Sequence, residues 1–151
     1  MKRLIISAVL LATTTVLVAA DTDSEETANW QTDYKTALKL AAYEKKPVLM
    51  DFTGSDWCRW CIKLDEEIFS KPKFQQFASE HLILLKVDFP ENIPQSDKLK
   101  KQNNNLDTKF QVEGYPTLIL IDSNGKEIER TRGYISGGPK ALIDWVNEAV
   151  K

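Results

Sequence analysis

The sequence has few of the residues from which proteins build metal centres: its 151 residues include two cysteines and one histidine. A structural zinc ion takes four ligands, and an iron–sulfur cluster needs more cysteines than this chain contains. Covalent haem attachment requires a histidine directly after the second cysteine, and Ile62 stands there instead. No resident metal or cofactor is therefore predicted, although two soft sulfurs can hold Cu(I), which leaves a copper-carrying role open.

Clustered positive charge is also absent. The chain has 20 Lys and Arg residues against 22 Asp and Glu, without the basic patch that indicates a nucleic-acid partner. With 42% apolar and 28% charged residues, the composition is that of one ordinary folded domain rather than a disordered or fibrous segment. No internal repeat or dimerisation segment is visible, so a monomer is expected.

The longest apolar run of the sequence lies at its N-terminus. Lys2 and Arg3 precede an almost uninterrupted apolar segment, 4–18, and small residues then lead to Ala20, which is the pattern of a signal peptide. The apolar segment is shorter than the roughly 20 residues of a membrane span, so cleavage after Ala20 is expected in preference to an uncleaved anchor. The predicted divisions are a signal peptide at 1–20, a disordered acidic leader at 21–29 and a folded domain at 30–151.

Cleavage would place the protein in the periplasm of a double-membraned bacterium, with no stable membrane insertion. Without Lys2 and Arg3 the basic residues fall from 20 to 18 against 22 acidic ones, a net charge of −4. Small domains in such oxidising compartments often use several disulfides as staples. A bridge between Cys58 and Cys61 would close a loop too short to stabilise the fold much, so this pair is not expected to be a structural staple.

Apolar patterns in the folded part predict an α/β domain. Compact runs at 48–52 and 82–89 indicate buried parallel strands joined by a helical crossover that begins at the cysteines. The segments 117–121 and 126–131 flank a turn, Asp122-Ser-Asn-Gly125, and are expected to form an antiparallel hairpin. Together they predict a central mixed four-stranded sheet flanked by helices on both faces. The expected helices span 30–44, 58–69, 70–78 with Ser70 as N-cap, about 99–112 with an irregular middle at Asn103–Asn105, and 137–149.

The two cysteines form a single C-x-x-C motif, Cys58-Arg-Trp-Cys61, between a predicted strand and the first turn of a predicted helix. The free amides at a helix start favour an anion, so Cys58 is expected to be a thiolate and to act as a nucleophile. Cys61 follows on the same helical turn and can attack the mixed disulfide that Cys58 forms. The spacing therefore favours thiol–disulfide exchange.

At this point the residues resemble the thioredoxin superfamily. The resemblance is carried by Asp51-Phe followed by W-C-x-x-C at the strand-to-helix junction and by Gly114-Tyr-Pro-Thr117 before a later strand, and it extends over 30–151. The wider sequence is similar to small exported thioredoxin-like proteins. The resemblance implies a thioredoxin fold and an oxidoreductase for protein disulfides, working as a reductase with a membrane electron donor of the DsbD kind. An oxidase or isomerase with the same chemistry, or a non-catalytic Cu(I)-binding module, is the alternative.

The resemblance also implies roles for residues around the cysteines. Pro116 would be cis and lie against the cysteines, with Tyr115 offering backbone groups to an extended substrate; a plain turn proline is the alternative. Asp51 would be a buried base toward Cys61, or else a strand-end residue bonded to backbone. The chain has one residue more than thioredoxin between this aspartate and the C-x-x-C motif, so segment 54–56 is expected to bulge.

Three side chains beside the nucleophile complete the predicted substrate-binding set. Arg59 would add positive charge that stabilises a thiolate, or would simply be solvated. Trp57 and Trp60 would offer apolar surface to unfolded or peptide substrates, or would act as packing residues.

Overall fold

The computed structural model describes residues 28–151. The predicted signal peptide and most of the predicted leader therefore lie outside the described residues. Between Ala28 and the C-terminus, no helix combines the length and the apolar character needed to span a bilayer.

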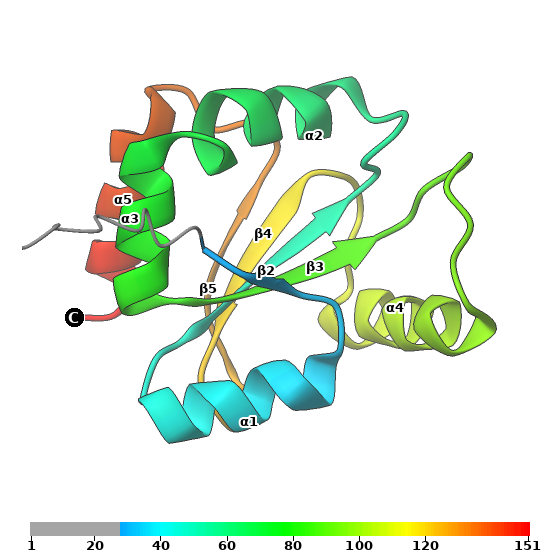
Figure 1. The fold of residues 1–151 in the computed structure, drawn as a ribbon, viewed down its shortest axis with the longest axis horizontal. Coiled ribbons are helices and arrows are strands. Elements are labelled where there is room, and N and C mark those ends of the chain that lie inside the picture. The colour runs from blue at the N-terminus through cyan, green and yellow to red at the C-terminus, as the bar shows by residue number, and fades with distance from the viewer. Residues whose placement is uncertain (1–27) are drawn as a thin grey trace, which may run out of the picture.

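A mixed sheet of five strands, in the order β1-β3-β2-β4-β5, runs through the centre of the domain (Figure 1). β3 lies parallel to both β1 and β2, whereas β4 pairs antiparallel with β2 and with β5. All six residues of β2 are buried, as expected for a central strand covered on both faces. The strands are β1 (Trp30–Gln31), β2 (Val48–Thr53), β3 (Ile83–Asp88), β4 (Thr117–Ile121) and β5 (Glu127–Arg132).

Helices cover both faces of this sheet, as the sequence predicts. α1 and α4 pack on one face through a core that includes Ala37 and Phe110, and the remaining helices pack on the other face around Phe69 and Leu142 (Figure 1). The α/β class and the thioredoxin fold are confirmed. The helical elements are α1 (Tyr34–Glu44), α2 (Arg59–Leu64), the π-helical segment η1 (Asp65–Phe69), α3 (Pro72–His81), α4 (Asp97–Phe110) and α5 (Gly138–Ala149).

The prediction of four strands was one short. Trp30 and Gln31, expected to open the first helix, instead pair with Leu84 and Leu85 as the edge strand β1. The helix begins later because the Asp33 carboxylate accepts the Thr36 N–H at 2.8 Å and so caps it. A strand of two residues is too short to show an alternating apolar pattern, which explains the error.

Two helix details also differ from prediction. Ser70 is not the N-cap of α3: it ends η1, and Lys71 takes the N-cap position without a side-chain hydrogen bond, while Pro72 occupies the first turn as expected. The three asparagines do not interrupt α4, which is continuous. Asn103 is buried there and donates from Nδ2 to the carbonyl of Asp88 at 2.9 Å, so its amide is satisfied outside the helix.

Candidate active site

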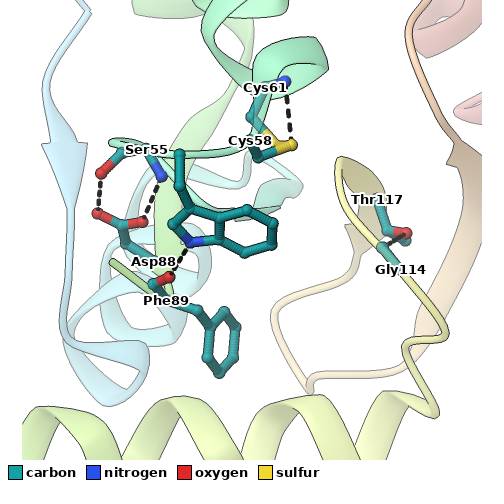
Figure 2. The surroundings of a disulfide bond; sticks show 8 residues. Ser55, Cys58, Cys61, Asp88, Phe89, Gly114 and Thr117 are labelled. Atoms are coloured by element: carbon teal, nitrogen blue, oxygen red, sulfur yellow. Dashed lines mark hydrogen bonds between the residues drawn. A yellow bond between two sulfur atoms is a disulfide. The ribbon is translucent and has the colours of Figure 1, made fainter. Parts of the chain in front are cut away.

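The cysteines lie just beyond the end of β2, where the chain enters α2. Cys58 is the N-cap residue of α2 and has extended backbone angles, and its sulfur accepts the Cys61 N–H at 3.3 Å. The two residues are joined in a disulfide with their Cα atoms 5.2 Å apart (Figure 2). The structure therefore brings together the two sulfurs that the C-x-x-C spacing pairs, at the start of a helix.

The disulfide is more enclosed than the sequence suggests. Cys58 is 7% exposed and Cys61 is 4% exposed, so the first cysteine has only a small opening to solvent. The residues beside it are far more open, with Trp57 44% and Trp60 49% exposed. Large flanking aromatic side chains, rather than the sulfurs themselves, make up most of the accessible surface next to the motif.

Asp51 lies inside the sheet rather than at a solvated strand end. It is 3% exposed and is flanked in the sheet by Lys86 of β3 and Leu118 of β4, and its Oδ1 atom finds no hydrogen-bond partner among residues 28–151. Burial raises the pKa of Asp51 to about 7, with smaller contributions from the negative charges of Asp65 and Asp88, against the opposing charge of Lys86. A carboxyl of this kind changes its protonation near neutral pH.

Lys86 is a residue that sequence reasoning missed. It occupies a partly buried position in β3, directly across from Asp51, and its Nζ lies 5.5 Å from the centre of the Trp30 ring. Its signal in the sequence is a lone lysine inside the apolar run at 82–89, in a strand predicted to pair with the strand of Asp51. A charge placed there moderates the effect of burial on the carboxyl.

The predicted extra segment, 54–56, forms a surface turn after the end of β2, which leaves Asp51 in its buried position. Gly54 is required within it, because an added Cβ would lie 2.4 Å from the indole ring of Trp57. That indole donates from Nε1 to the carbonyl of Phe89 at 2.8 Å (Figure 2). The turn therefore holds the tryptophan that precedes Cys58.

The second predicted motif lies next to the disulfide. The Tyr115–Pro116 peptide bond is cis, and the carbonyl of buried Pro116 accepts the Gly133 N–H at 2.8 Å. Thr117 donates its hydroxyl to the carbonyl of Gly114 at 2.7 Å, which closes the turn shown beside the disulfide in Figure 2. A pocket of about 220 Å³ opens here, lined by Glu113, Gly114, Tyr115, Pro116, Thr117, Arg132 and Gly133.

Aromatic rings link this loop to Trp57. Tyr115 stacks on Phe89 with ring centres 5.0 Å apart, and it meets Trp57 edge-on at 6.2 Å. Its hydroxyl donates to Asp107 at 3.0 Å, and partial burial together with this bond raises the pKa of Tyr115. Sequence reasoning did not select Phe89, because a single aromatic residue at a strand end carries no periodic signal.

Trp60 contacts a different part of the protein. Its ring lies 5.8 Å from that of Tyr134, and Lys63 Nζ lies near both rings, 5.5 Å from Trp60 and 4.8 Å from Tyr134. Tyr134 donates its hydroxyl to Glu67. The exposed Arg59 places its guanidinium 5.6 Å from the Trp60 ring. Both tryptophans thus make packing contacts while leaving nearly half of their surface open.

Across residues 28–151, no three His, Cys, Asp or Glu side chains gather in a way that could hold a metal ion. What the site offers chemically is a sulfur pair at a helix start, a buried carboxyl, and apolar surface on either side.

Comparison with known proteins connects this geometry to a family. The profile of the thioredoxin-like domain matches residues 34–149. The chain is 38% identical over 122 residues to the disulfide bond reductase DsbH of Chlamydia pneumoniae, covering 81% of this chain and 72% of that protein. The solved structure of a DsbH oxidoreductase superposes with a TM-score of 0.77 at 34% identity, covering 95% of this chain and 94% of the other.

Longer proteins also match. The chain is 31% identical over 112 residues to the thiol:disulfide interchange protein DsbD of Actinobacillus pleuropneumoniae. The matched region covers 73% of this chain but only 17% of that protein. It is 30% identical over 132 residues to the thioredoxin-related protein DsbJ of Chlamydia pneumoniae and spans 38% of its length. The chain therefore belongs to the thioredoxin-like family and is a thiol:disulfide oxidoreductase.

Proposed function

We propose that this chain is an exported reductase of protein disulfides, with Cys58 as the nucleophile and Cys61 as the resolving cysteine. The observation that carries the proposal is the position of the pair: Cys58 caps α2, Cys61 lies one turn behind it, and both are linked in a disulfide that the reduced enzyme would regenerate. The name of the relative from Chlamydia pneumoniae, a disulfide bond reductase, supports the direction.

The first step is attack by Cys58. In the reduced enzyme its thiolate attacks one sulfur of the substrate disulfide, that S–S bond breaks, and the other substrate sulfur leaves as a thiolate that takes a proton from solvent. The Cys61 N–H, which lies 3.3 Å from the Cys58 sulfur, favours the anionic form before attack. The product is a mixed disulfide between enzyme and substrate.

The second step is resolution by Cys61. Its thiol gives a proton to the Asp51 carboxylate, and the resulting thiolate attacks the Cys58 sulfur. The bond between Cys58 and the substrate breaks, and the second substrate sulfur leaves as a thiolate that takes a proton from solvent. Two electrons have then passed from the enzyme dithiol to the substrate, and the Cys58–Cys61 disulfide remains. A carboxyl with a pKa of about 7 suits this role, because it can accept and release a proton near neutral pH.

The surroundings would hold the substrate during both steps. Tyr115 and Pro116 present backbone next to the disulfide, where an extended segment would pair like an added strand. Trp57 and Trp60 offer apolar surface on either side, and Arg59 adds positive charge beside Cys58.

Turnover requires an external reductant, because each cycle leaves the enzyme oxidised. We assign this role to a membrane electron donor of the DsbD kind, which would reduce the Cys58–Cys61 disulfide by the same exchange in reverse. We further propose that the chain is exported by cleavage after Ala20 and acts in the periplasm as a monomer. N-terminal sequencing of the protein from the periplasmic fraction should begin at Asp21, and an intact Met1 there would contradict cleavage.

Insulin reduction tests the chemistry. In the presence of dithiothreitol the wild-type protein should accelerate insulin precipitation, whereas Cys58→Ser should lose the acceleration and give the rate of dithiothreitol alone. Cys61→Ser is the informative companion, because it should accumulate a mixed disulfide through Cys58 that resists release. Equal rates for wild type and Cys58→Ser would remove the reductase proposal.

The redox potential of the pair tests the direction. A reductase should have a potential near the roughly −270 mV of thioredoxin, whereas a value near about −120 mV would indicate an oxidase instead. Stoichiometric Cu(I) uptake without insulin reduction would favour the copper-binding alternative.

A further inference from the structure

The turn before the cysteines is fastened to a loop far away in the sequence. The Asp56 carboxylate accepts three consecutive backbone N–H groups of the β3–α4 loop, from Glu91 at 2.9 Å, Asn92 at 2.6 Å and Ile93 at 3.1 Å. The first of these bonds is the main reason why the pKa of Asp56 lies below its ordinary value. The middle of this loop is therefore held in place by the residue that lies two positions before Cys58.

Further hydrogen bonds fix the start of the same loop. Ser55 donates its backbone N–H and its hydroxyl to the two carboxylate oxygens of Asp88, at 3.0 and 2.6 Å (Figure 2). The carbonyl of Asp88 accepts the side-chain amides of Gln95 at 3.1 Å and Asn103 at 2.9 Å. Together with the bond from the Trp57 indole to the carbonyl of Phe89, these contacts leave the loop little freedom relative to the cysteines.

The loop presents an apolar side chain at its outer end. Ile93 is 53% exposed, and its own N–H is one of the three that Asp56 holds. Trp57, 44% exposed, lies next to Asp56 in the chain and next to the loop through its bond to Phe89. The bond to Asp56 holds the backbone of Ile93, so less backbone freedom is lost when a partner covers its side chain than on a mobile loop, which favours binding.

We propose that Ile93 is a specificity-determining residue and that Asp56 is the positioning residue that holds it beside Cys58. Ile93 and Trp57 then form an apolar wall beside the cysteine pair, with the polar Glu91 and Asn92 next to it in the same loop. The substrate side chain that contacts this wall is an apolar one, next to the target cysteine of a protein disulfide. The inference rests on the proposed function, because it concerns the substrate of the same cysteine pair.

Two disulfide peptides test the inference. They share one intrachain disulfide and differ in carrying leucine or serine on both sides of the target cysteine. Wild type should show a several-fold lower KM for the leucine peptide. Ile93→Ser should raise that KM by about three- to tenfold, the effect of losing part of a buried aliphatic contact, while kcat is retained. The KM for the serine peptide should change much less.

Val150→Ser is the matched control for the side chain. Val150 is 48% exposed and lines a pocket with Asp122 and Ser123, at the end of β4 opposite Pro116. Figure 1 shows the adjacent C-terminus on the side of the molecule away from the β3–α4 loop. This variant should leave the preference for leucine as in wild type.

Asp56→Asn tests the positioning role. It should also raise the KM for the leucine peptide and should speed hydrogen exchange at the amides of Glu91 to Ile93, because a neutral amide is a weaker acceptor than a carboxylate. Asp122→Asn is its control: that carboxylate accepts the backbone N–H groups of Asn124 at 2.8 Å and Lys126 at 2.9 Å in the β4–β5 turn. It should change neither the KM nor the exchange of the β3–α4 loop.

The outcomes separate the two proposals. If wild type reduces neither peptide, the proposed function fails. If it reduces both peptides with the same KM, and Ile93→Ser changes neither, the function stands and the apolar wall is wrong. If Ile93→Ser removes the preference but Asp56→Asn changes neither KM nor exchange, Ile93 keeps its role and the positioning role of Asp56 is wrong.

Discussion

Asp51 and Asp56 are two aspartates five positions apart, and the fold shifts their pKa values in opposite directions. Asp51 lies in the central strand, 3% exposed, with one oxygen unpartnered among residues 28–151, and burial raises its pKa to about 7. Asp56 lies on the surface turn and accepts three backbone N–H groups, which hold its pKa below the ordinary value. The side chains are identical, so the difference comes entirely from their surroundings.

The difference shows how two carboxyl groups in one short segment can suit different tasks, proton exchange at one and the holding of a loop at the other. A carboxyl without hydrogen-bond donors is an unstable anion and exchanges its proton readily near neutral pH. A carboxylate surrounded by amides keeps its charge and fixes the groups that donate to it. The first kind of site suits proton transfer, and the second suits the holding of a loop.

Asp51→Asn should have the largest effect on stability. The folded-state pKa of Asp51, about 7, exceeds its ordinary value of 3.8, so between these pH values the folded protein holds a proton on Asp51 that the unfolded chain has lost. The free energy of unfolding of wild type therefore falls as pH rises through this range, by up to roughly 4 kcal/mol. The amide variant lacks this loss. The disulfide-bonded variant should therefore match wild type near about pH 4 and be more stable by a few kcal/mol near about pH 8 in urea unfolding.

A constant difference between Asp51→Asn and wild type across that range would mean that Asp51 is ionised in the fold, and the contrast with Asp56 would disappear. The rate of mixed-disulfide resolution should also fall in this variant, because Cys61 would lose the proton acceptor that we propose for it. Asp122→Asn, on a surface turn, serves as the control and should show no gain in stability at higher pH.

Gly54→Ala should have an intermediate effect, and it disturbs the segment that joins the two aspartates. The new methyl group would lie 2.4 Å from the Trp57 ring, so the indole must move and its bond to Phe89 is lost. Such overpacking costs about 1–3 kcal/mol. Urea unfolding measures the cost, and the intrinsic fluorescence of the folded protein should shift as the Trp57 ring moves. Gly114→Ala is a suitable control, because an added Cβ meets nothing within 4 Å there.

Asp56→Asn should have the smallest effect on stability, because the carboxylate is on the surface. Its pKa is lowered in the folded state, so its contribution is present above the ordinary value of 3.8 and disappears as pH falls through the lowered pKa. The variant should be slightly less stable than wild type at neutral pH and equal to it in acid. A deficit that persists in acid would show that the bonds do not depend on charge.

The sequence predicts the framework of this site better than its detail. The position of Cys58 at a strand-to-helix junction follows from Pro47, the apolar run after it and the C-x-x-C spacing, and the thioredoxin fold agrees with that reading. Lys86 and the Asp56 network were not found, because both depend on contacts between β2 or its following turn and segments more than 30 residues away. A local pattern can mark Lys86 as unusual in an apolar strand, but it does not say which residue of another segment lies opposite it.

The same limit explains the errors in the elements. β1 exists because Trp30 and Gln31 find an edge of β3, and α4 is continuous because Asn103 finds the carbonyl of Asp88. Apolar spacing extended the first helix to Trp30, and the asparagine run predicted an irregular middle in α4; a tertiary partner decided the outcome in both cases.

The small opening at Cys58 limits which molecules can react with it. Because only 7% of that residue is exposed while Trp57 and Trp60 are each nearly half exposed, a sulfur must project from its own surface to reach Cys58. Disulfides buried inside a folded partner cannot reach a sulfur recessed in this way, whereas those on protruding or flexible segments can approach it. The depth of Cys58 thus favours reaction partners whose own sulfur stands clear of their surface.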